Sequence, residues 1–100
     1  MGTVTDVLTV VAWIRAASGA EEAVRTTLLS LVPPTLEEEG CIDYQLHVVD
    51  DDPGLFYFVE HWRSGEDLDA HLEKPHLKDA IIAVEGRIEG IDIKRMTRIA

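Results

Sequence analysis

Four stretches of the chain carry hydrophobic residues at every second position, a period that is typical of β-strands. Cys41 to Val49 is the simplest case, because its hydrophobic residues alternate with polar ones. Val7 to Ala16 and Leu55 to Arg63 are rich in β-branched and aromatic residues, and both of their faces are largely hydrophobic. Ile91 to Ile99 is the last such stretch. The pattern therefore predicts four strands, two of which need cover on both faces.

Hydrophobic residues at helical spacing follow the first predicted strand, at Val24, Leu28, Leu31 and Val32. The preceding Ser18-Gly19-Ala20-Glu21 has the pattern of a capping box, with Ser18 as the N-cap and Glu21 as its partner. Pro33-Pro34 cannot continue a regular helix, because each proline ring removes a backbone donor. We therefore expect a helix that starts at Ser18, kinks at the prolines and ends near Gly40.

Two shorter helices are predicted between the third and fourth strands. Ser64 and Asp67 form a second capping-box pattern, and the helix after them has Leu68, His71 and Leu72 on one face. Lys74-Pro75-His76 ends that helix. The next helix is expected to end at Gly86 and Gly90, and its hydrophobic stripe is Leu77, Ile81, Val84 and Ile88. His71 is therefore expected to point inward.

The order of these elements predicts the fold. Asp51-Asp52-Pro53-Gly54 is expected to form the tight turn of an antiparallel hairpin. A strand, a helix, two strands, one or two helices and a final strand make the split βαβ arrangement of the ferredoxin-like α+β fold. This fold has a four-stranded antiparallel sheet with its helices on one face. One hundred residues suffice for one domain, so residues 1–100 are expected to form a single one.

Assembly follows from the same pattern. Because the first and third strands are hydrophobic on both faces, the sheet face opposite the helices needs a cover of its own. A second copy of the same sheet is the simplest cover, and it would also help a chain of this size to bury enough surface. The sequence therefore predicts a homodimer.

The charge of the chain narrows the range of partners. Nine Lys and Arg against 19 Asp and Glu give a formal net charge of -10. Binding to nucleic acid or to an anionic membrane starts with basic residues that neutralise phosphates, so neither partner is expected. Met1 to Asp6 lacks the basic region of a secretory signal, and no hydrophobic run reaches the length of a membrane span. We expect a soluble, cytoplasmic protein.

Apart from the histidines, few residues are candidates for a catalytic, metal-binding or cofactor-binding role. Cys41 is the only cysteine, so an internal disulfide is excluded. Cys41 is expected to be a small buried residue. The acidic runs Glu37-Glu38-Glu39 and Asp50-Asp51-Asp52 stand beside turn signals and are expected to be solvated loops without a site. Asp67 and His71 lack a further ligand before the proline break, so no metal is expected. Nucleotide-binding motifs are also absent, and no cofactor is expected.

Four segments occur in an order that spans nearly the whole chain: Glu39-Gly40-Cys41-Ile42-Asp43-Tyr44, Asp52-Pro53-Gly54, Phe58-Val59-Glu60-His61-Trp62, and His71-Leu72-Glu73-Lys74-Pro75-His76-Leu77. Together they resemble the antibiotic biosynthesis monooxygenase family, whose members are dimeric α+β barrels. The resemblance implies a cofactor-independent monooxygenase of quinols or other electron-rich aromatic small molecules, with O₂ as the second substrate. In such chemistry the substrate is deprotonated and its anion reduces O₂ directly.

The resemblance also implies a dry pocket with a base and a hydrogen-bond donor, and three residues are candidates. His71 is the first choice for the base, because imidazole titrates near neutral pH. Trp62, at the end of the third strand, could donate its indole N–H to a substrate oxygen. His76 is expected either to line the pocket or to hydrogen-bond at the start of its helix. We therefore predict a catalytic site of His71, Trp62 and His76.

Other substrates and functions remain open from the sequence. Phe58 and Leu68 stand where polyketide oxygenases have Asn and Tyr, and the Asn, Trp and His of haem-degrading relatives are also replaced, by Ala12, His71 and Ile81. The motif around His71 is also similar to that of small isomerases of phosphorylated autoinducer-2 breakdown products, with Lys74, Lys78 and Arg15 as candidate phosphate donors. A dimer that binds a small ligand without catalysis is the third possibility.

Overall fold

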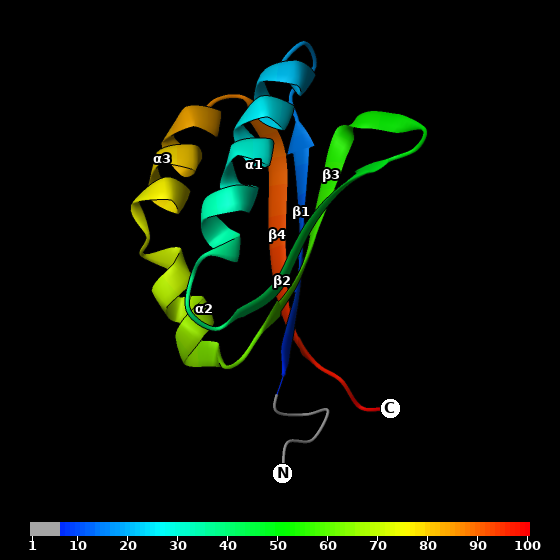
Figure 1. Cartoon of the computed structure of the whole chain (residues 1–100). Helices are drawn as coiled ribbons and strands as arrows, with labels where there is room; N and C mark the ends of the chain where they lie inside the picture. Colours follow the sequence, from blue (N-terminus) through cyan, green and yellow to red (C-terminus); the bar gives the residue numbers. More distant parts are fainter. Residues whose placement is uncertain (1–6) are drawn as a thin grey trace.

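Seven elements follow one another along the chain, in the order β1, α1, β2, β3, α2, α3, β4 (Figure 1). Their bounds are Leu8–Ala16, Glu21–Leu36, Cys41–Val49, Asp52–Trp62, Gly65–Leu72, Pro75–Val84 and Ile88–Thr97. This computed structural model describes residues 7–100, so the expectation for Met1 to Asp6 and the first six residues of the predicted domain lie outside the described part. No helix within residues 7–100 is long and apolar enough to cross a membrane.

The four strands form one antiparallel sheet in the order β2-β3-β1-β4. β3 lies between β1 and β2, so the crossover through α1 spans it, as in a split βαβ unit. All three helices cover the same face of the sheet (Figure 1). The predicted ferredoxin-like α+β fold is confirmed.

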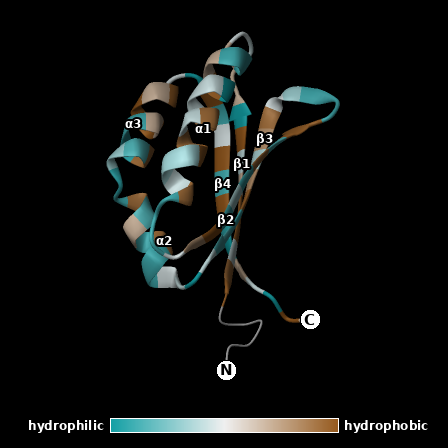
Figure 2. Cartoon of the chain, viewed as in Figure 1, coloured by the Kyte–Doolittle hydropathy of each residue, from teal (hydrophilic) through white to brown (hydrophobic). Residues whose placement is uncertain are grey.

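The core lies between this sheet face and the helices. Alternate residues of β1 and β3 point into it, among them Val10, Ile14, Phe56, Phe58 and Trp62. They pack against residues spaced at about one helical turn on α1, namely Val24, Leu28 and Leu31. Figure 2 shows the hydrophobic colouring along β1 and β3 and the hydrophilic colouring at the turn between β2 and β3.

No helix formed by residues 7–100 covers the other face of the sheet (Figure 1). In β1 and β3 its residues are half-buried and mostly hydrophobic: Val11 and Trp13 on one strand, and Leu55, Tyr57 and Val59 on the other. We call these five residues the bare face. The predicted two-sided hydrophobicity of the two strands is thus present, whereas the homodimer stays a prediction.

The first helix differs from its prediction at both ends. It begins at Glu21 with Ala20 at the N-cap, because Gly19 adopts a left-handed φ of 88° and turns the chain after Ser18. The Glu21 side chain accepts from the backbone N–H of Gly19 at 2.9 Å, so the expected Ser18 cap is wrong. The helix contains Pro33 and Pro34 and ends at Leu36, four residues before Gly40. The carbonyls that these prolines leave unpaired belong to exposed residues and can bind water.

The hairpin and the last strand also start elsewhere than expected. Val49 pairs with Asp52, so the turn consists of residues 50 and 51, and Pro53 lies inside β3. Proline is tolerated there because β3 pairs with β1 only from Leu55 onward. β4 begins at Ile88, which the sequence assigned to the preceding helix, because Gly86 with a φ of 77° already reverses the chain.

Candidate active site

A cavity of about 140 Å³ lies between the helices and the sheet. Every helix and strand contributes to its lining, which is hydrophobic except for Tyr44, Glu60, His71 and Arg95. An engineered cavity of similar size, about 150 Å³, binds benzene. The space therefore suits one aromatic ring, with a few polar groups to orient it.

The mouth of the cavity lies between α3 and β4. Ile81 of α3 and Ile91 and Ile93 of β4 belong to its lining, yet about half of each residue's surface is exposed. Arg95, also on β4, belongs to the lining as well and forms an ion pair with Asp69 at 2.8 Å. A ligand that entered here would first pass the exposed isoleucines and would then reach the polar residues inside the cavity.

His71 is the buried imidazole of this lining, as the sequence predicted. α2 places it inward, and its start is fixed by Ser64, whose Oγ accepts from the backbone N–H of Asp67 at 3.2 Å. His71 is 2% exposed, and its ring packs against that of Trp62 with centroids 4.8 Å apart. Burial lowers the pKa of His71, and its hydrogen bond to Glu38 opposes that shift.

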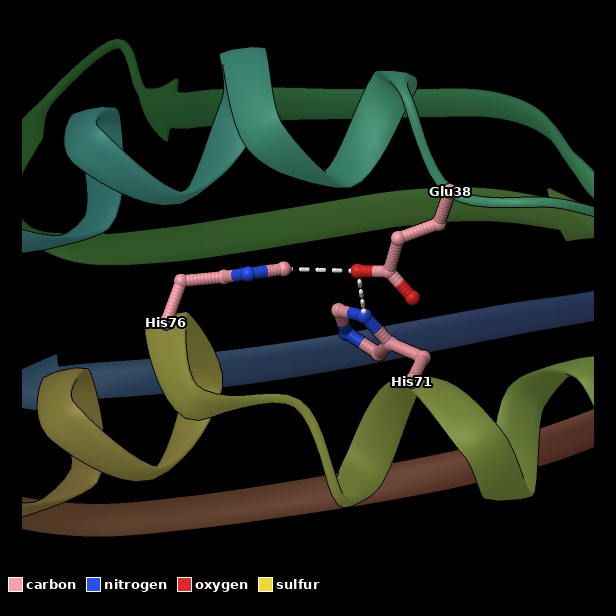
Figure 3. A group of neighbouring side chains, drawn as sticks. All are labelled: Glu38, His71 and His76. Atoms are coloured by element: carbon pink, nitrogen blue, oxygen red, sulfur yellow. Dashed lines mark hydrogen bonds and ion pairs between the residues drawn. The ribbon is translucent and has the colours of Figure 1, made fainter.

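Glu38 joins the two predicted histidines (Figure 3). Its Oε2 lies 2.7 Å from Nδ1 of His71 and 2.6 Å from Nε2 of His76. Because an ionised carboxylate only accepts, both ring nitrogens donate to it. This leaves Nε2 of His71 without its proton. Among residues 7–100 no side chain is recorded as a partner of that nitrogen, so it can serve a ligand in the cavity that His71 lines.

The expectation that Glu37-Glu38-Glu39 is a solvated run without a site is therefore wrong at its middle residue. Glu37 and Glu39 are exposed, whereas the side chain of Glu38 is only 6% exposed. The sequence could not single it out, because the three glutamates have identical chemistry and lie between helix and strand. The packing of α2 and α3 selects one of them.

Glu60 is the second functional candidate that the sequence analysis missed. Its carboxyl is 5% exposed, lines the cavity and accepts from the indole N–H of Trp62 at 2.9 Å. Burial raises the pKa of Glu60 to about 7, and the Trp62 hydrogen bond opposes this shift. The sequence did contain a signal for Glu60, because it shares the buried face of its strand with Phe58 and Trp62. Burying a carboxyl group there costs free energy unless it is hydrogen-bonded.

The structure brings His71, Trp62 and His76 close to one another, but only His71 lines the cavity. His71 lines the cavity, whereas Trp62 is fully buried against its ring and already donates to Glu60. His76, at the start of α3, does not line the cavity and reaches Glu38 from the solvent side, with 24% of its side chain exposed. None of the three candidate phosphate donors, Arg15, Lys74 and Lys78, lines the cavity. Arg15 pairs with Asp52, and Lys78 pairs with Glu73.

The Glu38, His71 and His76 cluster also has the composition of a metal site, which the sequence analysis did not expect. Its three potential ligand atoms lie within 4.8 Å of one another. Two ligands of a tetrahedral ion bound at about 2.1 Å lie ~3.4 Å apart. The observed separations of 2.6 and 2.7 Å are instead those of charge-assisted hydrogen bonds. The arrangement therefore suits proton chemistry better than metal binding.

Comparison with known proteins places this chain in a family. The profile of the antibiotic biosynthesis monooxygenases matches residues 7–82. The chain belongs to this family. It is 35% identical to the probable quinol monooxygenase YgiN of Escherichia coli K12, over 87% of this chain and 93% of that protein. The resemblance stated from the sequence is thus confirmed.

Solved structures share the fold of this chain. PA3566 from Pseudomonas aeruginosa superposes with a TM-score of 0.92 at 34% identity, covering 99% of this chain and 100% of that one. SO0527 from Shewanella oneidensis superposes with a TM-score of 0.88 at 28% identity, covering 94% and 92%. Family membership supports a monooxygenase-type function.

Proposed function

We propose that this protein is a cofactor-independent monooxygenase of small quinols. The observation that carries the proposal is a one-ring hydrophobic cavity lined by the buried imidazole of His71, whose Nδ1 is held by Glu38 so that Nε2 is left for a ligand. A relative described as a probable quinol monooxygenase supports the choice of substrate class.

The reaction that fits this cavity converts a 1,4-quinol and O₂ into a hydroxyquinone and water. His71 Nε2 accepts a phenolic proton, and the O–H bond breaks. The quinolate transfers electrons to O₂, and a ring carbon forms a C–O bond to the resulting peroxide. Loss of the ring hydrogen and cleavage of the O–O bond release water. The substrate supplies both electrons that the second oxygen atom requires, so no external reductant is needed.

The neighbouring residues support this chemistry. Glu60 holds a proton over much of the physiological range, because its pKa is raised to about 7, and can donate it to the departing oxygen. Trp62 holds the Glu60 carboxyl and backs the imidazole ring. The hydrophobic walls exclude water, which strengthens every electrostatic interaction with the quinolate.

We also propose that two copies associate through the bare face. Its hydrophobic residues on β1 and β3 have no cover within residues 7–100 (Figure 1). Association would bury them and brace the strands that line the cavity from the other side.

Oxygen uptake tests the proposed reaction. The purified protein, treated with EDTA and given no cofactor, is mixed with 1,4-dihydroxybenzene or 1,4-dihydroxynaphthalene in an oxygen electrode. Uptake above the no-protein rate is expected, with a hydroxyquinone as product. His71→Gln should lower kcat by about 10²-fold or more, because it removes the general base.

His47→Gln is the matched control, since His47 is exposed on β2 and does not belong to the cavity lining. It should keep the wild-type rate. A catalysed rate that His71→Gln leaves unchanged would remove His71 from the proposed role, and no uptake with any quinol would reject the proposed function itself.

A further inference from the structure

We propose that Glu38 and His76 are positioning residues for His71: Glu38 selects its reactive tautomer and balances its charge, and His76 holds Glu38 in place. The inference rests on the proposed function, in which His71 Nε2 is the base. Neither residue lines the cavity, so both act through His71 and not on the substrate.

The first argument is the tautomer. A neutral imidazole has one protonated nitrogen, and the partner of the other nitrogen decides which one it is. Nδ1 of His71 lies 2.7 Å from Glu38 Oε2, so the proton resides on Nδ1 and the lone pair on Nε2. Without Glu38, the proton would be free to occupy Nε2, and His71 could no longer accept a proton from a substrate.

The second argument is the charge that develops during the reaction. His71 becomes an imidazolium when it takes the proton, in a place where burial disfavours charge. The side chains of His71 and Glu38 are 3% and 6% exposed, so their attraction is screened little by water. The other charged or titratable neighbours of His71 are His76 and Lys74, with Tyr44 beside its ring and Glu60 and Arg95 in the same cavity. His76 and Lys74 oppose a positive charge on His71, so Glu38 is the group that stabilises it.

The third argument is the second hydrogen bond on the same oxygen. Glu38 lies between α1 and β2, in a segment without helix or strand structure that would hold its side chain. His76 donates to Oε2 at 2.6 Å from the first turn of α3, while His71 donates from the last turn of α2 (Figure 3). The Pro75 break between the two helices puts the histidines on either side of the carboxylate. The carboxylate is thereby fixed from two directions.

Two measurements test the proposal on the full-length protein. ¹⁵N NMR of the histidine rings reports the tautomer and the titration of His71 without any substrate. In the wild type we expect the Nδ1–H form. Glu38→Met, which removes the acceptor, should shift His71 toward the Nε2–H form, whereas Glu38→Gln keeps an acceptor and should lower the pKa of His71 without changing its tautomer. With a quinol and O₂, Glu38→Gln should lower kcat by about 10²-fold with KM within about twofold, because only the charged state of His71 loses its partner.

Three further variants sharpen the test. Glu37→Gln, the exposed neighbour in the same acidic run, should match the wild type in both measurements. His76→Ala should lower kcat less than Glu38→Gln does, and His76→Gln, which keeps a donor for Glu38, should recover most of the loss. Far-UV circular dichroism confirms that each variant is folded.

The outcomes separate this proposal from the proposed function. An unchanged His71 tautomer in folded Glu38→Met, or an unchanged kcat in Glu38→Gln, overturns the positioning role. A tautomer shift in a protein that oxidises no quinol supports the positioning role and rejects the reaction. Turnover that is lost after EDTA treatment and restored by a divalent ion overturns the proposal, because the three residues would then hold a metal.

Discussion

At the scale of single residues, burial stabilises the uncharged form of two titratable groups in the cavity, Glu60 and His71. It raises the pKa of the Glu60 carboxyl and lowers that of the His71 imidazole. Each shift favours the uncharged form. Burial thus reduces the charge that His71 and Glu60 carry in the cavity, which favours entry of an uncharged aromatic ring.

Glu60→Gln should make the protein more stable, and more so at high pH. The pKa of Glu60 is about 7 in the folded protein against 4.5 ordinarily, so the folded state holds its proton more tightly. Its stabilising effect is complete below pH 4.5 and is lost as the pH rises through 7. Glutamine carries no charge and still offers an acceptor to Trp62. We expect the gain in unfolding free energy to be ~2 kcal/mol larger at pH 8 than at pH 5.

Urea unfolding at the two pH values measures this gain. Glu66→Gln serves as the control, because Glu66 is an exposed residue in the first turn of α2. An equal effect of Glu60→Gln at both pH values would mean that the carboxyl titrates normally.

At the scale of elements, the short helices between β3 and β4 assemble the site. The N-cap at Ser64 starts α2, and Pro75 separates α2 from α3, so that His71 and His76 face one carboxylate. Gly40 matters for the same region, because its φ is 84° and the Asp67 side chain packs against its Cα. A side chain at position 40 would strain the backbone and collide with α2, close to Glu38.

Ser64→Ala should destabilise the protein by about 1 kcal/mol, because α2 loses the side-chain acceptor for the Asp67 N–H. Thermal or urea unfolding measures the change. Ser30→Ala is the matched control: Ser30 is exposed inside α1, where alanine is at least as good a helix former. Equal effects of the two substitutions would show that the cap contributes nothing specific.

At the scale of the whole molecule, the sheet has one face under three helices and one face without cover (Figure 1). The bare face is hydrophobic on both central strands although the chain carries a net charge of -10. Two such faces can pair without bringing that charge into the contact. Hydrophobic surface of this kind is typical of association sites, which supports the proposed homodimer.

Val59→Glu should therefore dissociate the proposed homodimer, since it puts a charge on the bare face of the central strand β3. We expect the dissociation constant to rise at least about tenfold, as measured by sedimentation velocity over a range of concentrations. Val48→Glu is the control, because Val48 is 37% exposed on the edge strand β2 and lies outside the bare face. A wild-type protein that sediments as a monomer at all concentrations would contradict the proposed dimer.

The sequence by itself determined the element order, the fold and the inward position of His71. These depend on local periodicity and on capping residues, so the β2 strand from Cys41 to Val49 and the Ser64 cap were predicted correctly. The ends of helices and strands that depend on the backbone conformation of a glycine could not be predicted from the sequence. The left-handed Gly19 displaced the first helix start from Ser18, and the left-handed Gly86 started β4 early.

Only the tertiary structure decided which acidic residues belong to the site. Glu38 and Glu60 lie 33 and 11 positions before His71 in the chain, and no spacing rule connects them with it. Packing buries both carboxyls, brings Glu38 within hydrogen-bond distance of two histidines and places Glu60 in the cavity. Burial and proximity between distant segments are properties of the folded chain, because the desolvation that shifts a pKa exists only once the surrounding elements have packed.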